Sequence, residues 1–239
     1  MWLVIVSDLV LVTGASGGIG AAIVERLASR GYSLVGLDAI APPRAVRKRL
    51  SGFMGVDLLD PSALEAACDE VRNNQPRLWA LVFCAGMYPI RRFDEYSITL
   101  WEQVHAVNVN SIFSACLALS SRLRRGGRIV IISSGAAHVG SLDPGYSSSK
   151  AGALGLSRSL ARTFGKRQIL VNAIAPGVID TQMSRRMSNA RKQAHIHQTV
   201  LGRVGRPAEV AICVDFLLDR SNTYMTGATL DVNGGLYLR

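Results

Sequence analysis

A tyrosine and a lysine in the stretch YSSSK, residues 146–150, have the types and the spacing for proton transfer. Residues four apart lie on one face of a helix. A tyrosine hydroxyl is a poor base at neutral pH because its ordinary pKa is near 10. A neighbouring ammonium favours the tyrosinate, so we expect Lys150 to lower the pKa of Tyr146 toward the working range. Without further context, the same spacing also fits an ordinary helix start with a surface lysine.

A second stretch, LVTGASGGIG from Leu11 to Gly20, could hold a pyrophosphate. Its pattern of strand, glycine loop and helix presents unpaired N–H groups and the positive end of a helix dipole. Gly14 would permit a tight turn, Gly18 a close approach of backbone to phosphates, and Gly20 the packing of helix on strand. Asp38 ends the next apolar run, where an acid could accept both hydroxyls of a ribose. The stretch therefore predicts a dinucleotide site.

Alternating strands and helices must position these residues. Short apolar runs predict buried parallel strands, and periodic segments with caps predict helices between them. The strands are expected at 9–13, 33–38, 52–57, 78–86, 128–133, 169–175 and 228–232, and the longest helices at about 99–123, 146–164 and 207–218. This order predicts an α/β fold in which residues 1–239 form one domain around a doubly wound parallel sheet of about seven strands flanked by helices. The polar, basic segment at about 178–206 is expected to be a substrate lid.

The composition favours a globular protein with an anionic ligand. Of the 239 residues, 49% are hydrophobic and 18% charged, which argues against disorder. Four separated cysteines without a Cys/His cluster favour a reduced protein with no metal. The formal charge of +10 gathers at 44–49, 122–128 and 185–192. These clusters are either a solvated surface or an attraction for an anionic ligand or acidic partner, and without interleaved aromatics they do not favour nucleic acid.

The ends of the chain bear on location and assembly. The N-terminal segment MWLVIVSDLVLV lacks the basic start of a signal peptide, and no uncharged run is long enough to span a membrane. We therefore expect a cytoplasmic protein with no membrane partner. A surplus of apolar residues on the two long helices, together with the tail GGLYLR, predicts an interface between copies. The residues concerned are Ile112, Phe113, Leu117, Leu154, Leu156 and Leu160.

Four motifs in one order resemble the short-chain dehydrogenase/reductase family. They are TGASGGIG, YSSSK, NAIAPGVIDT at 172–181 and DVNGG at 231–235, and the resemblance covers nearly the whole chain. It is greatest to a subgroup of bacterial 3-oxoacyl-carrier-protein reductases and small-alcohol dehydrogenases, which share motifs without sharing a substrate. The resemblance implies a Rossmann fold, a homotetramer, and hydride transfer between a nicotinamide cofactor and a secondary alcohol or ketone.

The resemblance also implies roles for individual residues. Tyr146 would be the general acid/base, Lys150 would also hold the nicotinamide ribose, and Asn108 would hold a water for a proton relay. A serine should bind the substrate oxygen; spacing from the tyrosine allows Ser133, whereas the local pattern and strand alternation favour Ser134. The implied cofactor contacts are Gly14, Ser16, Gly18, Ile19, Gly20, Asp38, Asp57, Ala85, Gly86, Tyr146, Lys150, Pro176, Gly177 and Thr181.

The substrate pocket is weakly defined in the sequence. Candidates by position are Met87, Tyr88, His138, Val139, Met183 and Met187, each of which could equally be loop packing. His195 and His197, two apart, do not resemble a metal pair. The family's paired asparagines are replaced by Phe83 and Cys84, which puts local bracing of the sheet in doubt.

Three classes of function remain open: an oxidoreductase, a silent nucleotide-binding protein, and a basic nucleic-acid or acidic-partner binder. The main reading is an oxidoreductase that uses NAD(H) on a secondary alcohol or ketone. The alternative is a 3-oxoacyl-carrier-protein reductase that uses NADPH, with an acidic carrier near Arg124, Arg125, Lys166 and Arg167.

Asp38 favours NAD(H) over NADP(H). Its carboxylate would repel a 2′-phosphate by roughly 4 kcal/mol at an effective dielectric near 20. A few residues further on, Arg44, Arg47, Lys48 and Arg49 could favour that phosphate instead.

Overall fold

A seven-stranded, wholly parallel sheet forms the centre of the computed structural model, which describes residues 8–74 and 77–238. The strands follow the order β3-β2-β1-β4-β5-β6-β7 across the sheet. Their bounds are β1 Leu9–Thr13, β2 Ser33–Asp38, β3 Gly52–Gly55, β4 Leu78–Phe83, β5 Leu123–Ile132, β6 Leu170–Pro176 and β7 Thr229–Val232. The doubly wound parallel sheet predicted from the sequence is confirmed. Residues 1–7 of the apolar N-terminal segment and Arg239 of the tail lie outside the described residues.

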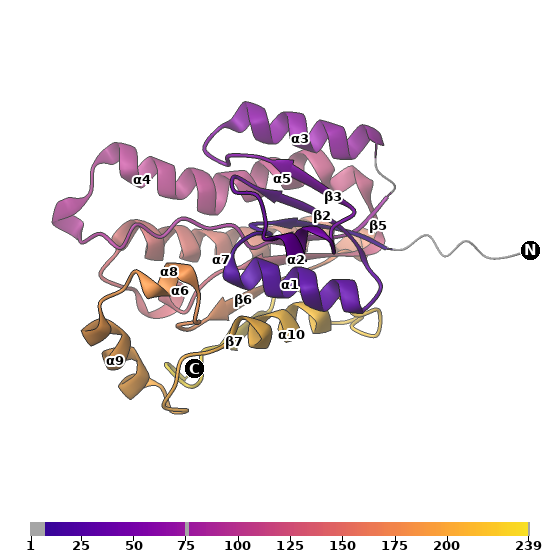
Figure 1. Cartoon of the computed structure of the whole chain (residues 1–239). Coiled ribbons are helices and arrows are strands. Elements are labelled where there is room, and N and C mark those ends of the chain that lie inside the picture. The colour runs from indigo at the N-terminus through magenta and orange to yellow at the C-terminus, as the bar shows by residue number, and fades with distance from the viewer. Residues whose placement is uncertain (1–7, 75–76, 239) are drawn as a thin grey trace, which may run out of the picture.

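Helices cover both faces of the sheet (Figure 1). One face is covered by α3 (Pro61–Asn74), α5 (Ser111–Leu119) and α7 (Pro144–Phe164), and the other by α1 (Gly18–Ser29), α2 (Arg44–Arg47) and α10 (Pro207–Leu218). Along β1 the buried side chains alternate between the two cores, Leu9 and Leu11 in one, Val10 and Val12 in the other. This alternation is the period of a strand covered on both sides.

The lid segment carries two short helices, α8 (Gln182–Arg185) and α9 (Asn189–Gln198). A further short helix, α6 (Ala136–Val139), lies between β5 and α7, and α4 (Ile98–His105) precedes α5. Single turns of 3-10 helix occupy Phe93–Glu95, Ser120–Arg122 and Gly165–Arg167. Figure 1 shows α9 standing apart from the two helical layers, beyond the end of the sheet.

The glycine loop after β1 is held from both sides. On one side, Gly14 N donates to the carbonyl of Leu37 at the end of β2 (2.8 Å). On the other, Ala85 N donates to Oγ1 of Thr13 (3.3 Å) after β4. Gly14 has φ +69°, and a Cβ there would lie 2.6 Å from Ala85 N, so only glycine fits this turn.

The long helix predicted at 99–123 is wrong in detail. A π-helical turn, Ala106–Asn110, separates α4 from α5, and β5 already begins at Leu123 rather than at 128. A π-helical turn inserts an extra residue into the helical ladder and often marks a functional position. Here it contains Asn108, whose side chain is fully buried.

The helical stretch Ile98–Arg122 is long and apolar enough to cross a membrane by length and composition. Its α5 part contributes Ile112, Ala115 and Leu119 to the core that covers one face of the sheet. A helix that buries one face in this way passes the same test of length and composition as a membrane span.

The apolar surplus predicted on α5 and α7 is only partly at the surface. Ile112, Leu154 and Leu160 are buried within the chain, so their selection as interface residues is wrong for the simple reason that they fill the core. Phe113 and Leu117, however, are 53% and 72% exposed on α5. These two residues form an apolar patch that no other described residue covers fully.

Candidate active site

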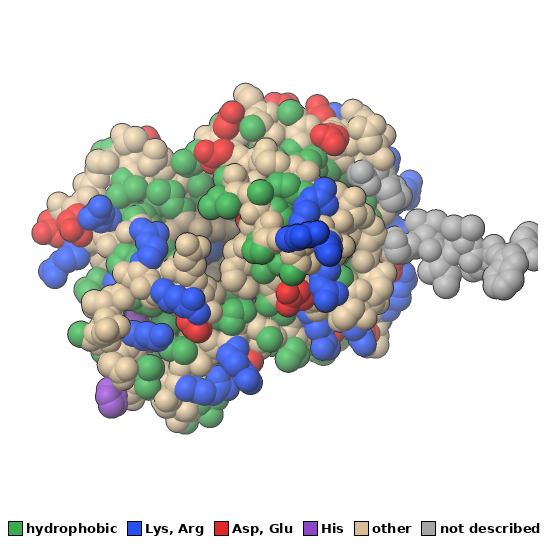
Figure 2. Space-filling model, viewed as in Figure 1, with side chains coloured by type: hydrophobic (Ala, Val, Ile, Leu, Met, Phe, Trp, Pro, Cys, Tyr) green, Lys and Arg blue, Asp and Glu red, His purple; other side chains and the backbone are tan. Residues whose placement is uncertain are grey.

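A cleft of about 1130 Å³ lies at the carboxyl ends of the strands. It sits beside β1 and β4, where the strand order reverses direction, which is the usual ligand position in open α/β sheets. Its lining includes every predicted cofactor-binding residue together with Ser134. Asn108, the remaining predicted site residue, is buried behind the wall of the cleft. Figure 2 shows a hollow in the face viewed.

The glycine loop presents the start of α1 to the cleft. The N-cap is Gly17, without a side-chain hydrogen bond, so the first N–H groups of the helix have no protein cap. A Cβ on Gly20 would lie 1.9 Å from the Gly14 carbonyl oxygen, and one on Gly18 would lie 2.8 Å from Cγ2 of Thr181. The loop therefore fits closely against itself and the lid, and its exposed N–H groups suit an anion.

Asp38 is fixed at the end of β2. One carboxylate oxygen accepts from Ser16 N (3.0 Å) and the other from Ile40 N (3.1 Å). The basic residues at 44–49, which the sequence left as competitors for a 2′-phosphate, do not line the cleft among the described residues. On the same side, Asp57 Oδ1 accepts from Leu59 N (2.9 Å). Fixed negative charge therefore marks this end of the cleft.

Burial dominates the acid–base behaviour of Tyr146. It raises the pKa of Tyr146 to about 12, although a hydrogen bond with Ser134 lowers it, and Asp143 and Tyr88 raise it further. Lys150 Nζ is 5.9 Å from the centre of the tyrosine ring and donates to the Ile132 carbonyl (2.9 Å). The prediction that Lys150 lowers this pKa is therefore wrong for this structure, because desolvation outweighs the distant charge.

Lys150 is itself perturbed by its surroundings. It is 4% exposed, and burial lowers its pKa from 10.5 to about 8. A Cβ on Gly86 would lie 3.1 Å from its Nζ and 3.4 Å from Oδ1 of Asn108. A glycine at 86 therefore lets the lysine and the asparagine approach the backbone at the cleft wall.

Asn108 joins three segments. Its Oδ1 accepts from Met87 N (2.8 Å), and its Nδ2 donates to Met87 O (3.0 Å) and to Ser149 Oγ (2.9 Å). These bonds connect the π-helical turn to the segment after β4 and to α7. The asparagine thus holds the backbone beside Gly86 in place.

The two candidate serines have different surroundings. Ser133 is buried, and its hydroxyl donates to the Lys150 carbonyl (2.8 Å). Ser134 shares a hydrogen bond with Tyr146 and lines the cleft. Both serines line the cleft, but the Ser133 hydroxyl is engaged by backbone, whereas the Ser134 hydroxyl meets Tyr146, as strand alternation led us to expect.

Asp143 is a buried carboxylate that sequence reasoning missed. It is 1% exposed, caps α7 by accepting from Tyr146 N (2.9 Å), and also accepts from Arg91 N (2.9 Å) and Tyr96 Oη (2.5 Å). The sequence signal that could have identified it is the pair Asp143-Pro144, because an aspartate directly before a proline is typical of a helix start. Asp143 therefore anchors the start of the helix that presents Tyr146.

The substrate side of the cleft is formed by the lid and by the segment after β4. Tyr88 stacks on Tyr146, with ring centres 4.2 Å apart. Of the sequence candidates, Tyr88, Val139, Met183 and Met187 line the cleft. The other two, Met87 and His138, do not: Met87 offers its backbone to Asn108, and the His138 ring lies 5.4 Å from that of Tyr237. Arg191 and His195 line the lid side, although the sequence did not mark Arg191 individually.

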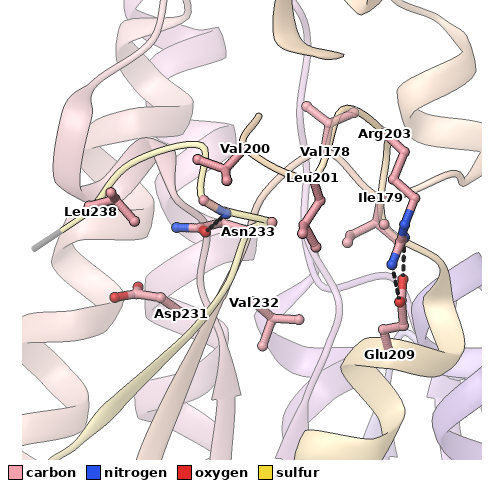
Figure 3. A pocket seen from close by; sticks show the side chains of 13 residues that line it. Val178, Ile179, Val200, Leu201, Arg203, Glu209, Asp231, Val232, Asn233 and Leu238 are labelled. Atoms are coloured by element: carbon pink, nitrogen blue, oxygen red, sulfur yellow. Dashed lines mark hydrogen bonds and ion pairs between the residues drawn. The ribbon is translucent and has the colours of Figure 1, made fainter. Parts of the chain in front are cut away.

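A second, smaller pocket of about 440 Å³ lies between the two ends of the lid segment 178–206 and the C-terminal residues 231–238 (Figure 3). Val200, Leu201 and Leu238 give it an apolar lining. Arg203 and Glu209 form an ion pair at one side (2.7 Å). None of the predicted site residues lines it.

The basic residues predicted to meet a carrier lie at the other end of β5 from the cleft. Arg124 pairs with Asp8 (2.7 Å), and Arg167 donates to the carbonyls of Ser120 and Leu123. These side chains have internal partners and are not wholly available to an external one. Among residues 8–74 and 77–238, no group of three or more His, Cys, Asp or Glu side chains could hold a metal ion.

Known proteins of similar sequence are reductases. The family described as "Enoyl-(Acyl carrier protein) reductase" matches residues 14–237. The 3-oxoacyl-[acyl-carrier-protein] reductase of Aquifex aeolicus is 37% identical, covering 95% of this chain and 96% of its own. That of Escherichia coli is 34% identical, covering 96% and 97%.

Solved structures of similar fold agree with these sequence matches. A short-chain dehydrogenase/reductase from Brucella melitensis is 28% identical, with a TM-score of 0.89 and coverage of 97% of both chains. A blue fluorescent protein from a metagenomic library, in complex with NADPH, is 31% identical, with a TM-score of 0.90 and coverage of 97% and 98%. The match in sequence and in fold extends over the glycine loop, the YSSSK helix and the lid alike, so the chain belongs to the short-chain dehydrogenase/reductase family and is an NAD(P)-dependent oxidoreductase that acts on CH–OH or keto groups.

Proposed function

We propose that the protein reduces the keto group of a 3-oxoacyl substrate to a secondary alcohol. The observation that carries this proposal is the position of the half-buried Tyr146 hydroxyl, which lines the cleft and shares a hydrogen bond with Ser134, in surroundings that raise its pKa to about 12. A tyrosine that keeps its proton at neutral pH is a general acid, as reduction requires. The names of the similar curated proteins favour a 3-oxoacyl thioester over the small alcohol or ketone of the main sequence reading.

A nicotinamide cofactor held by the glycine loop and Lys150 would supply the hydride in the proposed mechanism. Ser134 orients the keto oxygen, and Tyr146 gives its proton to that oxygen as the carbon gains the hydride. The product is a hydroxyl group, and the tyrosinate left behind is reprotonated from solvent. Asn108 and Lys150 both approach Gly86 at the cleft wall, where Lys150 would hold the cofactor and both could support the return of that proton.

A substrate comparison tests the reaction. We expect S-acetoacetyl-N-acetylcysteamine and an acetoacetyl carrier protein to be reduced with a higher kcat/KM than 2-pentanone, which lacks the thioester. Consumption of reduced cofactor measures all three. A preference for the simple ketone would restore the small-alcohol reading, and no turnover of any ketone would favour a silent nucleotide-binding protein.

For the cofactor we propose NAD(H), on the strength of Asp38. Its carboxylate is fixed by two backbone N–H groups at the end of β2 and would repel a 2′-phosphate bound beside it. The NADPH in a similar solved structure favours the opposite choice. The test is kcat/KM with NADH and NADPH in the wild type and in Asp38→Asn, which removes the charge but keeps the shape. We expect the variant to narrow the preference for NADH, and a wild type that prefers NADPH would contradict the proposal.

We further propose that the 239 residues act as one domain, with 178–206 as a substrate lid, in a cytoplasmic homotetramer. The lid is supported by Met183, Met187 and Arg191, which close one side of the cleft. Assembly is supported by the exposed Phe113 and Leu117.

A further inference from the structure

We infer that Arg191, on the lid helix α9, binds a second oxygen group of the substrate, either a carboxylate or a thioester carbonyl close to the reacting ketone. The inference deepens the proposed function and rests on it, because it takes the ketone to lie at Tyr146. No sequence motif marks Arg191. Its role follows from its position over the cleft.

A chain of contacts connects Arg191 to Tyr146. Arg191 Nη2 donates to Tyr88 Oη (2.8 Å), and the Tyr88 ring stacks on that of Tyr146 at 4.2 Å. The guanidinium carbon is 6.0 Å from the centre of the Tyr88 ring. Together these distances place the guanidinium within about 10 Å of the Tyr146 ring centre. Arg191 is therefore close enough to contact a short substrate whose ketone is bound to Tyr146.

Arg191 has donors to spare. A guanidinium carries five N–H groups in a planar fork that matches a carboxylate. Its single side-chain hydrogen bond to another described residue is the one to Tyr88. A neutral phenol is a weaker partner for a cation than a carboxylate would be. The remaining N–H groups suit an oxygen acceptor in the cleft.

Charge separates the two sides of the cleft. Arg186 and Arg191 line the lid side, and the carboxylates in the described lining, Asp38 and Asp57, lie at the ends of β2 and β3. Burial and the nearby Arg191 lower the pKa of His195, so this histidine is neutral at pH 7 and the positive charge belongs to the arginines. Figure 2 shows basic side chains gathered over the lid around α8 and α9. An acidic or strongly polar group is favoured on this side.

Distance limits which oxygen group this is. The phosphate of a carrier or coenzyme is the length of a pantetheine arm away from the ketone. Arg191 is too close to Tyr146 to meet that phosphate when the ketone is in place. The acceptor must then belong to the acyl part itself, which in a 3-oxo compound is the carboxylate or thioester carbonyl two carbons from the ketone.

The experiment compares substrates with and without that oxygen. The full chain is assayed with acetoacetate, S-acetoacetyl-N-acetylcysteamine and 2-pentanone, as wild type, Arg191→Gln and Arg191→Lys. Lys192→Gln is the matched control, because it removes one charge from the adjacent position of α9, which does not line the cleft. Binding of acetoacetate to the cofactor-loaded protein is measured by calorimetry in each variant, independently of turnover.

We expect Arg191→Gln to lower kcat/KM about 10- to 100-fold for at least one oxygen-bearing probe, as for the loss of a hydrogen bond to a charged group. The effect on 2-pentanone and the effect of Lys192→Gln should stay within about twofold, and Arg191→Lys should recover part of the loss. An equal loss on all three substrates, or none, would overturn the inference.

Two further results separate the possible failures. Tyr88→Phe removes the hydroxyl that accepts a hydrogen bond from Arg191. If Arg191 only fastens the lid through this bond, Tyr88→Phe will lower kcat/KM in the same way as Arg191→Gln. We expect Tyr88→Phe instead to keep the higher kcat/KM of the oxygen-bearing probes over 2-pentanone. If the wild type reduces no ketone, the proposed function fails, and calorimetry alone decides the inference. Acetoacetate affinity that is equal in the wild type and Arg191→Gln would overturn it.

Discussion

Desolvation of the half-buried Tyr146 raises its pKa and favours the protonated form, and the hydrogen bond with Ser134 partly offsets this shift. The pKa of about 12 is farther from neutrality than a base would need. The same value suits an acid that gives up its proton only as negative charge develops on a neighbouring oxygen. At the scale of the residue, the raised pKa is consistent with the reduction proposed above.

Replacing Tyr146 by phenylalanine tests this role. We expect turnover to fall roughly 10²- to 10⁴-fold, the usual contribution of general acid–base catalysis, while cofactor binding measured by fluorescence stays within a few fold. Ser134→Ala should be far more harmful than Ser133→Ala, because the Ser133 hydroxyl donates to the Lys150 carbonyl, whereas that of Ser134 bonds Tyr146. Substantial turnover by Tyr146→Phe would show that another group supplies the proton.

Lys150 predicts a pH dependence of stability. Its folded pKa of about 8 lies below the ordinary 10.5. Between these values the unfolded chain binds the proton and the folded chain does not, so this group makes the protein more stable as pH rises through that window. The full shift corresponds to roughly 3 kcal/mol.

We therefore expect the stability of Lys150→Met relative to the wild type to fall by about 2 kcal/mol between pH 7 and about pH 9.5. Urea unfolding at both pH values measures the difference, and the variant should be inactive at each. A difference that does not change with pH would mean that Lys150 keeps its ordinary pKa in the folded protein.

At the scale of the element, α7 depends on its first turn. Asp143 receives hydrogen bonds from Tyr146 N, Arg91 N and Tyr96 Oη while almost wholly buried. Truncation leaves these donors without their partner. Asp143→Ala should lower the free energy of unfolding by about 2–4 kcal/mol.

A matched cap on another helix gives the control for Asp143. Ser97 caps α4 through Leu100 N alone (3.1 Å), in an exposed position. Ser97→Ala should cost about 1 kcal/mol. Equal losses for the two variants, measured by urea unfolding, would mean that Asp143 acts as a cap and nothing more.

The elements were easier to predict from the sequence than the contacts between them. Apolar runs located all seven strands, because a strand that is covered on both faces needs apolar side chains at nearly every position. The π-helical turn around Asn108 escaped prediction, since one extra residue in a helix barely changes its periodicity. Contacts between distant segments also escaped prediction, because periodicity reports only local structure. Examples are the contacts among Arg191, Tyr88 and Tyr146, which join residues up to about a hundred positions apart, and the internal partners of Arg124 and Arg167.

At the scale of the whole molecule, apolar surface predicts assembly. Phe113 and Leu117 on α5 are exposed, as are Ile212 and Phe216 on α10, at 52% and 50%. Two separate apolar patches suit a closed tetramer with two kinds of interface. We expect light scattering at micromolar concentration to give the mass of a tetramer, and Leu117→Glu to give a smaller species. A monomeric wild type would contradict this.

The way in which the glycine loop is held has a consequence for how the protein is made. Gly14 N in the loop donates to the Leu37 carbonyl of β2, and Thr13 Oγ1 at the end of β1 accepts from Ala85 N after β4, although β4 is synthesised more than sixty residues after β1. When only β1, β2 and β3 have been synthesised, the nascent chain already contains the glycine loop and Asp38. It still lacks β4 and the residues after β4 that form one wall of the cleft. Recognition of the cofactor must therefore wait until β4 pairs beside β1, so the nascent chain acquires its ligand late. A compound that binds the loop therefore binds, and stabilises, only chains in which β4 has already paired with β1.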